Sequence, residues 1–221
     1  MATLSELRTR IARKLANDNL VNPTSSEIDT AINLAIEYYE TDAFWFSEAT
    51  ANITLVAGDP IVPSIPTDFK QLIEPNALTV IDGQVRYPLI HATPLQYDNV
   101  DSEGRGLPYA YTYRNNQFEL YFYPDQAYTL QFFYRKSYAD LVNDGDSNDF
   151  TNFAERLIEY KTMVDLLYDY RENDRRAIIY ENRVEREYEK IKRETYNRTA
   201  TGMLTTENII GRGRYNYYYQ V

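Results

Sequence analysis

A change of hydrophobic period along the chain constrains its fold more than any other feature. From Leu4 to Leu15, apolar residues recur every three or four positions, which predicts an amphipathic helix. Between residues 49 and 55, apolar and polar side chains alternate, which is typical of a strand. After residue 150 the helical spacing returns. We therefore expect helices at both ends of the chain and a β-region inserted between them.

The two N-terminal helices have well-defined predicted starts. Thr3 with Glu6, and Thr24 with Glu27, have the spacing of a capping box, in which two side chains and two backbone N–H groups bond reciprocally. The second of these helices is predicted to run to about Asp42. A loop containing Pro23 separates them.

The two C-terminal helices are predicted from the same kind of signal. Asn152 with Glu155 is read as the cap of the third helix. Residues 172–174 break the apolar spacing, and a fourth helix follows. Its periodicity stops near Thr195, so the helix is predicted to end there.

The middle of the chain contains several short strand patterns separated by turn signals. Asp82-Gly83 between two of them is a strong hairpin signal. Short strands at this spacing indicate a small antiparallel β-sandwich or barrel. The predicted strands span residues 49–55, 78–81, 85–90, 109–113, 118–123 and 128–134.

These patterns predict an α+β protein with three parts. Residues 1–43 and 151–195 are expected to form a four-helix bundle, with two helices from each end of the chain. Residues 44–150 are expected to form the inserted β-domain. Residues 196–221 have three glycines and no helical periodicity, and are predicted to be an extended C-terminal arm.

Composition excludes much of the usual catalytic equipment. The 221 residues include no Cys, which removes disulfides, thiolate nucleophiles and zinc–thiolate sites. The only His, His91, ends a predicted strand and is expected to be a polar residue in or near the core. No catalytic residue and no cofactor is predicted. The carboxylates are numerous, but the sequence gives no reason to select a catalytic pair among them.

One loop has a weak resemblance to a calcium site. Its oxygen-bearing residues fall at positions 1, 3, 5, 9 and 12 of the calcium-loop template. However, Asp149 replaces the glycine that makes the sharp turn at position 6. We therefore expect a solvated loop, with calcium binding as the alternative. The residues concerned are Asp144, Asp146, Asn148, Asn152 and Glu155.

Charge and tyrosine content point towards protein partners. The formal net charge is −10, which argues against a general duplex binder, because affinity for DNA comes mostly from neutralising phosphates. Residues 22–150 contain 19 acidic and 6 basic residues. The 22 tyrosines suit interfaces, where one side of the ring is packed and the other is wet. No apolar run is long enough to span a bilayer, so no membrane association is expected.

The arm combines apolar, aromatic and basic residues, which favours a binding role over a solvated tail. Arg212 and Arg214 stand in a Gly-Arg-Gly-Arg segment, which leaves nucleic-acid binding as an alternative. Folding back onto its own subunit is the other alternative. The residues expected to bind a partner are Ile209, Ile210, Arg212, Arg214, Tyr215, Tyr217, Tyr218 and Tyr219.

The order of four stretches resembles the head-to-tail adaptor (connector) proteins of tailed bacteriophages, over about residues 3–195. The first stretch is the helix at residues 31–39 followed by Phe44-Trp45-Phe46. The second is the Pro66-Thr67-Asp68-Phe69 step, the third runs from Gly106 to Asp125 and on through the 128–134 strand, and the last is the helical return from Phe153.

The resemblance implies a structural virion protein rather than an enzyme. About twelve copies would form a ring below the portal and line the DNA channel. The arm would bind the portal protein, the β-domain would face a tail or nozzle protein, and DNA would pass without specific binding. The protein would be made in the host cytoplasm and reside in the virion neck. The alternatives are a carboxylate-based peptidoglycan-degrading enzyme, or another neck or tail subunit.

Overall fold

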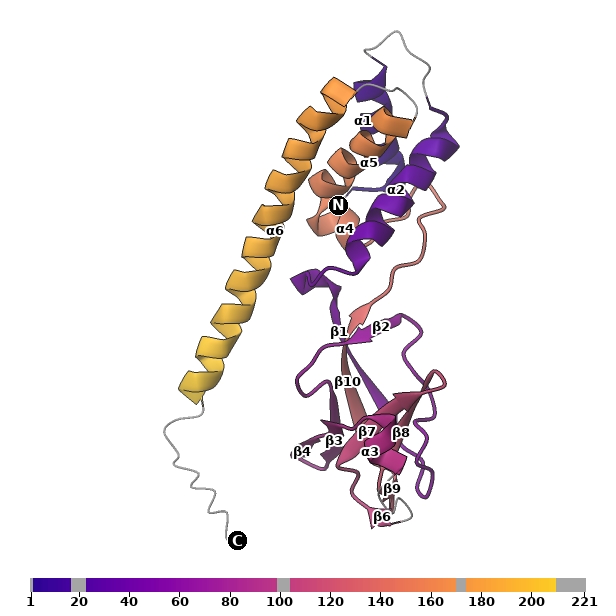
Figure 1. Ribbon diagram of the computed structural model, residues 1–221, viewed down its shortest axis with the longest axis vertical. Coiled ribbons are helices and arrows are strands. Elements are labelled where there is room, and N and C mark those ends of the chain that lie inside the picture. The colour runs from indigo at the N-terminus through magenta and orange to yellow at the C-terminus, as the bar shows by residue number, and fades with distance from the viewer. Residues whose placement is uncertain (1, 17–22, 99–103, 170–173, 210–221) are drawn as a thin grey trace. The chain divides into compact units, whose positions relative to one another are not determined.

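The structure is a computed structural model that describes residues 2–16, 23–98, 104–169 and 174–209 (Figure 1). It combines helices with sheets that are mainly antiparallel, so the predicted α+β class is confirmed. Contacts divide the chain into two compact units. The helical unit comprises residues 1–46 and 140–221, and the β unit comprises residues 47–139.

The first two helices begin where the capping boxes predict. In α1 (Leu4–Leu15) the Thr3 hydroxyl accepts the Glu6 N–H, and the Glu6 carboxylate accepts the Thr3 N–H in return. The same reciprocal pair starts α2 (Ser25–Glu40) at Thr24 and Glu27. These bonds satisfy backbone N–H groups that have no partner inside a helix.

The predicted cap of the third helix is wrong. Asn152 lies within a short helix, α4 (Asp149–Phe153), and Glu155 begins the next one, α5 (Glu155–Asp169). The cap is Asn148, whose Oδ1 accepts the Thr151 N–H at 3.1 Å while the Thr151 hydroxyl accepts the Asn148 N–H at 3.0 Å. A search for Glu or Gln at the third position misses this box because Thr fills that place.

The last helix, α6 (Asp174–Ile209), continues 14 residues past the predicted end at Thr195. The expectation of an extended arm from residue 196 is therefore wrong for residues 196–209. Contacts within the helical unit support the continuation as far as Arg198. The Thr195 hydroxyl accepts the Trp45 N–H at 3.4 Å, and the Arg198 guanidinium stacks 3.7 Å from the centre of the Trp45 ring. Polar side chains thus extend the packed face where apolar periodicity has stopped.

The core of the helical unit is centred on α5, which packs against α1, α2 and α6. Fully buried aliphatic residues such as Leu7, Ile32 and Leu157 fill it, together with a group of packed aromatic rings in which Phe44 and Phe150 meet edge to face. Residues 140–150 belong to this unit rather than to the β insert predicted at 44–150. They do so because the N–H groups that start α1 bond to their carbonyl groups, from Leu4 to Asp146 at 3.0 Å and from Ser5 to Asp144 at 3.2 Å.

The larger sheet of the β unit is antiparallel and is organised around its longest strand, β10. Strand β10 pairs with β1 on one side and with β3 and β2 on the other, and β4 pairs with β3. Strands β3 and β4 form the predicted hairpin, in which Gly83 takes a positive φ of 59°. The strands are β1 (Glu48–Thr54), β2 (Phe69–Leu72), β3 (Leu78–Asp82), β4 (Val85–Pro88) and β10 (Thr129–Lys136).

A second sheet has the order β5-β7-β8, in which β7 and β8 form a hairpin. Buried side chains from both sheets, among them Phe118 and Phe132, make one core. The short elements β2, β6 and α3 were not predicted from sequence, and the strand predicted at 85–90 is divided between β4 and β5. The remaining elements are a 3₁₀ helix η1 (Trp45–Ser47), β5 (Ile90–His91), α3 (Pro94–Asp98), β6 (Arg105–Gly106), β7 (Ala110–Arg114), β8 (Gln117–Tyr121) and β9 (Tyr123–Pro124).

Candidate assembly surfaces

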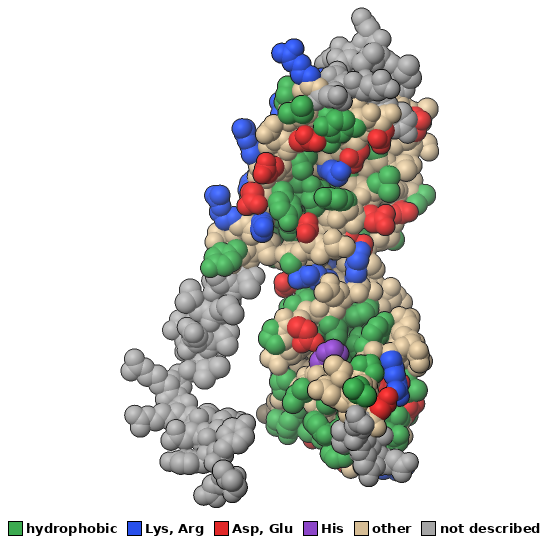
Figure 2. All heavy atoms as spheres, in the orientation of Figure 1, with side chains coloured by type: hydrophobic (Ala, Val, Ile, Leu, Met, Phe, Trp, Pro, Cys, Tyr) green, Lys and Arg blue, Asp and Glu red, His purple; other side chains and the backbone are tan. Residues whose placement is uncertain are grey.

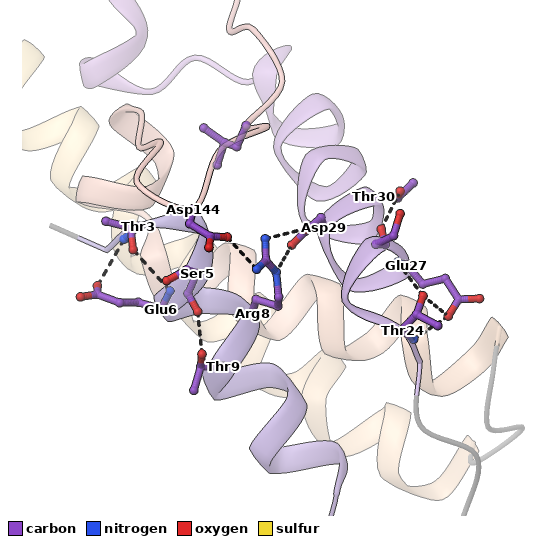
Figure 3. A network of polar contacts seen from close by, with 12 residues as sticks. Thr3, Ser5, Glu6, Arg8, Thr9, Thr24, Glu27, Asp29, Thr30 and Asp144 are labelled. Atoms are coloured by element: carbon purple, nitrogen blue, oxygen red, sulfur yellow. Dashed lines mark hydrogen bonds and ion pairs between the residues drawn. The ribbon is translucent and has the colours of Figure 1, made fainter.

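A network of polar contacts centred on Arg8 joins distant segments of the helical unit (Figure 3). The guanidinium of Arg8 on α1 forms two bonds to Asp29 on α2, at 2.6 and 2.7 Å. It donates a third to Asp144, in the loop before α4, at 2.8 Å. The bonds to Asp29, followed by that to Asp144, raise the pKa of Arg8 above its usual value. The two carboxylates therefore hold three segments together through one cation.

The five calcium-candidate residues make different contacts in the structure. Asp144 pairs with Arg8, and Glu155 pairs with Arg10 on α1. Asp146 instead accepts the backbone N–H groups of Asn143 and Val142, which hold its pKa below the usual value. Asn148 caps α4, and Asn152 lies within that helix. Among the described residues, no group of three or more His, Asp or Glu side chains is placed to hold a metal ion.

His91 differs from the sequence expectation of a residue in or near the core. Its side chain is exposed on the edge strand β5, where its ring stacks 5.1 Å from that of Tyr111. His91 does lie in a strand, as its sequence pattern predicts. However, that strand, β5, is only two residues long and lies at the edge of its sheet. An edge position leaves one side of the strand open to solvent.

A groove of about 590 Å³ lies between α2, α5 and α6 in the helical unit. Tyrosine rings line it, and most of its charged side chains are acidic. Tyr38 on α2 is 62% exposed, and the Lys161 ammonium stands 4.8 Å from its ring centre. Burial raises the pKa of Tyr39 and of Tyr188, which lie deeper in the groove. The acidic side chains in the lining are Asp42, Glu181 and Glu185.

The charges of this groove are only partly compensated within the chain. Lys161, the basic residue of the lining, bonds to Asp165 at 2.7 Å. Glu181 accepts the Tyr168 hydroxyl at 3.0 Å, which is a neutral donor. Glu185 forms no ion pair with any other residue that the structure describes. The groove therefore presents carboxylates beside tyrosine rings, an arrangement that favours a cationic guest.

The outer face of α6 has the opposite charge. At 3.6 residues per turn, positions 11 and 18 apart point within about 20° of each other, so Arg175, Arg186 and Arg193 form one stripe. All three are exposed, and none forms an ion pair within the described part of the chain. Figure 2 shows Lys and Arg side chains along the edge of α6 and acidic side chains on the neighbouring face. Sequence reasoning treated this helix as mixed in charge and missed the stripe, although its spacing is visible in the sequence.

The β unit carries an apolar patch around a pocket of about 300 Å³. Ile90 is 68% exposed, and Tyr109, which also lines the pocket, packs edge-on against Tyr121. The pocket floor includes Tyr97, whose hydroxyl donates to the Leu120 carbonyl at 3.1 Å. Burial raises the pKa of Tyr97 to about 12. Exposed large apolar side chains gathered in this way are typical of a protein-binding surface.

The predicted partner-binding residues of the C-terminus fall at the end of the described chain. The backbone of Ile209 ends α6. The other members, Ile210, Arg212, Arg214, Tyr215, Tyr217, Tyr218 and Tyr219, lie outside the described residues, as does the Gly-Arg-Gly-Arg segment.

The described residues combine a groove of tyrosines and carboxylates with exposed basic and apolar surfaces, which is typical of a protein that binds other proteins. Comparison with known families agrees. Residues 2–206 match the SU10 adaptor protein family, so the chain belongs to that family, and the resemblance to phage head-to-tail adaptors is confirmed. No curated protein matches the chain. Membership makes this a phage structural adaptor and a component of the virion neck. In the part of the chain that the structure describes, no helix has the length and apolar character of a membrane span.

Proposed function

We propose that copies of this chain form a closed ring that joins the portal of the phage head to the tail. The match to the adaptor family over residues 2–206 is the observation that carries the proposal. A ring of identical subunits needs heterologous contacts, in which two different surfaces of one subunit meet. The helical unit offers such surfaces in its groove and in the outer face of α6. We expect about twelve copies, with the helices arranged as a bundle around the DNA channel.

The C-terminal segment is proposed to bind the portal protein. Because α6 continues to Ile209, the segment available for this role is residues 210–221 rather than 196–221. Fully extended, these residues reach at most about 40 Å. In extended geometry Tyr215, Tyr217 and Tyr219 face one side and Tyr218 the other, so their rings fit alternate pockets of a groove or sheet edge. Arg212 and Arg214 add charge-assisted contacts, and Ile209 and Ile210 add apolar area.

The β unit is proposed to contact the tail or nozzle protein. Its support is the apolar patch that includes Ile90 and Tyr109, which leaves large side chains open to solvent. Such side chains gain free energy when a partner covers them. No observation on the structure favours a peptidoglycan-degrading enzyme, so that alternative is not carried further.

DNA is proposed to pass through the ring without specific binding. The chain is acidic overall, and phosphates are repelled by a surface of the same sign. The helical unit has nine acidic and no basic residues in the stretches 22–46 and 140–150 together.

The portal contact can be tested by truncation. The full chain, a chain ending at Ile209, and a full-length variant with the four tyrosines at 215, 217, 218 and 219 changed to Ser would each be mixed with the portal protein of the same phage. Electron microscopy and sedimentation should show rings on the portal only for the full chain. Circular dichroism serves as the control for folding. Undiminished binding by the truncated chain would contradict the assignment of the C-terminus.

A further inference from the structure

We propose that the basic stripe of α6 (Arg175, Arg186 and Arg193) docks into the tyrosine-lined groove between α2, α5 and α6 of a second copy of this chain. This inference rests on the proposed ring and assigns the two surfaces that meet in it. Both surfaces lie in the helical unit. Within the described chain, the three stripe arginines form no ion pair, and neither do Glu181 and Glu185 of the groove.

The two surfaces are complementary in charge and in the types of side chain that they present. Glu181 and Glu185 are one helical turn apart on α6 and both line the groove, without a cation between them in the described chain. An arginine guanidinium can bind a carboxylate through two parallel bonds and stack on a tyrosine face at the same time. The groove already uses this chemistry internally, since Lys161 stands over Tyr38 and Lys192 lies 5.6 Å from the Tyr188 ring centre.

Helical geometry prevents the stripe of one copy from binding the groove of the same copy. At 100° per residue, Arg186 points about 100° away from Glu185 and about 140° away from Glu181 around the same straight helix. The stripe and the groove of one subunit therefore face different directions. A contact between the stripe of one copy and the groove of the next is heterologous, so each added copy leaves one free stripe and one free groove until a ring closes.

The stripe also carries apolar area, which favours a protein partner over a nucleic acid. Ile178 and Ile179 are each half exposed beside Arg175. Lys190 bonds to Glu187 at 3.6 Å, and Glu189 lies on the same outer side of the helix. A phosphate backbone would gain nothing from the isoleucines and would be repelled by these carboxylates. The groove, by contrast, includes Val164 and Val184, against which the isoleucines of a second copy can be buried.

Because the natural chain has no Cys, single introduced cysteines can report this contact directly. Asn182→Cys places a thiol beside the stripe, and Thr41→Cys places one at the groove. The two variants, one carrying a mass tag, would be mixed and oxidised. Random collision gives mixed and like-with-like dimers in a statistical ratio of about 2:1:1, whereas docking predicts that the mixed dimer dominates. Gln84→Cys, in the exposed turn of the β unit, is the matched control and should give the statistical ratio with either partner.

Charge reversal then tests the chemistry of the contact. Arg186→Glu with Arg193→Glu in the stripe chain should lower the mixed dimer by about tenfold. Adding Glu181→Lys with Glu185→Lys to the groove chain should restore it, because the attraction is re-created with the signs exchanged. Arg86→Glu in the β unit should change nothing.

The outcomes separate this proposal from the adaptor function. A statistical ratio of dimers for the Asn182→Cys and Thr41→Cys pair overturns the proposed interface, while binding of the full chain to the portal would leave the adaptor function standing. Retention of duplex DNA that the stripe reversal abolishes, together with random cross-links, would make the stripe a nucleic-acid surface and would also overturn the proposal. Failure of the full chain to join the portal would count against the adaptor function and not against the docking of copies.

Discussion

The two units rely to different degrees on ion pairs and on tyrosine hydroxyls to connect their segments. In the helical unit, cations on α1 bind carboxylates far along the chain, from Arg8 to Asp29 and Asp144 and from Lys14 to Glu159. In the β unit, backbone ladders join the strands, and tyrosine hydroxyls add bonds to carboxylates. Tyr134 donates to Asp68 at 2.8 Å, and Tyr111 donates to Glu74.

This difference follows from how each unit is threaded. The helical unit is interrupted by the insert, so α1 and α2 must associate with α5 and α6 across 93 residues of other chain. Helices satisfy most of their own backbone groups, so side chains make most of the contacts that set their relative register. The β unit is continuous, and its strands already exchange backbone bonds. Its tyrosines can therefore pack as core residues and use their hydroxyls to satisfy buried polar positions.

The strongest test of this comparison is to destabilise one unit by substitution and to measure whether the other unit stays folded. Phe118 is 1% exposed in the core shared by the two sheets. Phe118→Ala should lower the free energy of unfolding of the β unit by about 3–5 kcal/mol, from lost burial and the cavity left behind. Amide hydrogen exchange should accelerate in residues 47–139 while α1, α2 and α5 keep their protection.

The reciprocal variant is Ile11→Ala, which removes a fully buried side chain from α1. It should cost about 2–5 kcal/mol and accelerate exchange in the helices alone. Loss of protection in both units by either variant would mean that they unfold as one cooperative block, and the comparison would fail.

A second prediction concerns the ionic connection of the helical unit. Glu159 on α5 is 4% exposed and lies beside Lys14 and Arg10. Glu159→Gln keeps the shape but removes the charge, so it should lower the free energy of unfolding by about 1–3 kcal/mol in urea denaturation. Glu37→Gln, an exposed neutralisation on α2, is the control and should stay within about 0.5 kcal/mol. Equal effects of the two variants would show that the buried pair adds nothing.

Sequence predicted elements best where local chemistry alone determines them. The capping boxes at Thr3 and Thr24 and the Asp82-Gly83 turn depend on residues within four positions of each other, and all three occur as expected. The end of α6 could not be predicted in this way. The helical turn that follows Thr195 packs against Trp45, which lies 150 residues earlier in the chain, and that contact exists only in the folded unit.

The candidate surfaces show the same limit. The arginine stripe follows from helical geometry once α6 is known to be continuous, and sequence reasoning that weighed only the net charge of the helix missed it. The groove brings Tyr38, Lys161 and Glu185 together from three helices, and no local pattern connects them. The position of His91 was misjudged because its strand lies at an edge, which the alternation of side chains does not reveal.

The smallest expected effect is a change in how the stability of the β unit depends on pH. Burial, followed by the bond to Asp68, raises the pKa of Tyr134 to about 12. An ordinary tyrosine has a pKa of about 10, so folding favours the neutral phenol. The resulting stability is complete below pH 10 and is lost as the pH rises through about 12. The β unit should therefore lose stability between pH 10 and 12. Burial also raises the pKa of Tyr39 and of Tyr188 in the helical unit, so the test is made at Tyr134 and followed within the β unit.

Tyr134→Phe tests this assignment. At pH 8 the variant should be less stable by about 1 kcal/mol, since the Asp68 carboxylate loses a donor. From pH 8 to 11.5 its stability should fall less steeply than that of the natural chain, with the remaining slope due to groups such as Tyr111, whose pKa is also raised by burial and by Glu74. Tyr87→Phe, on the exposed strand β4, removes a hydroxyl from the surface and is the matched control. Denaturant titrations that monitor the β unit at each pH would give the slopes. Equal slopes for Tyr134→Phe and the natural chain would show that the bond to Asp68 does not stabilise the fold, and the contrast between ionic and phenolic connections would then rest on geometry alone.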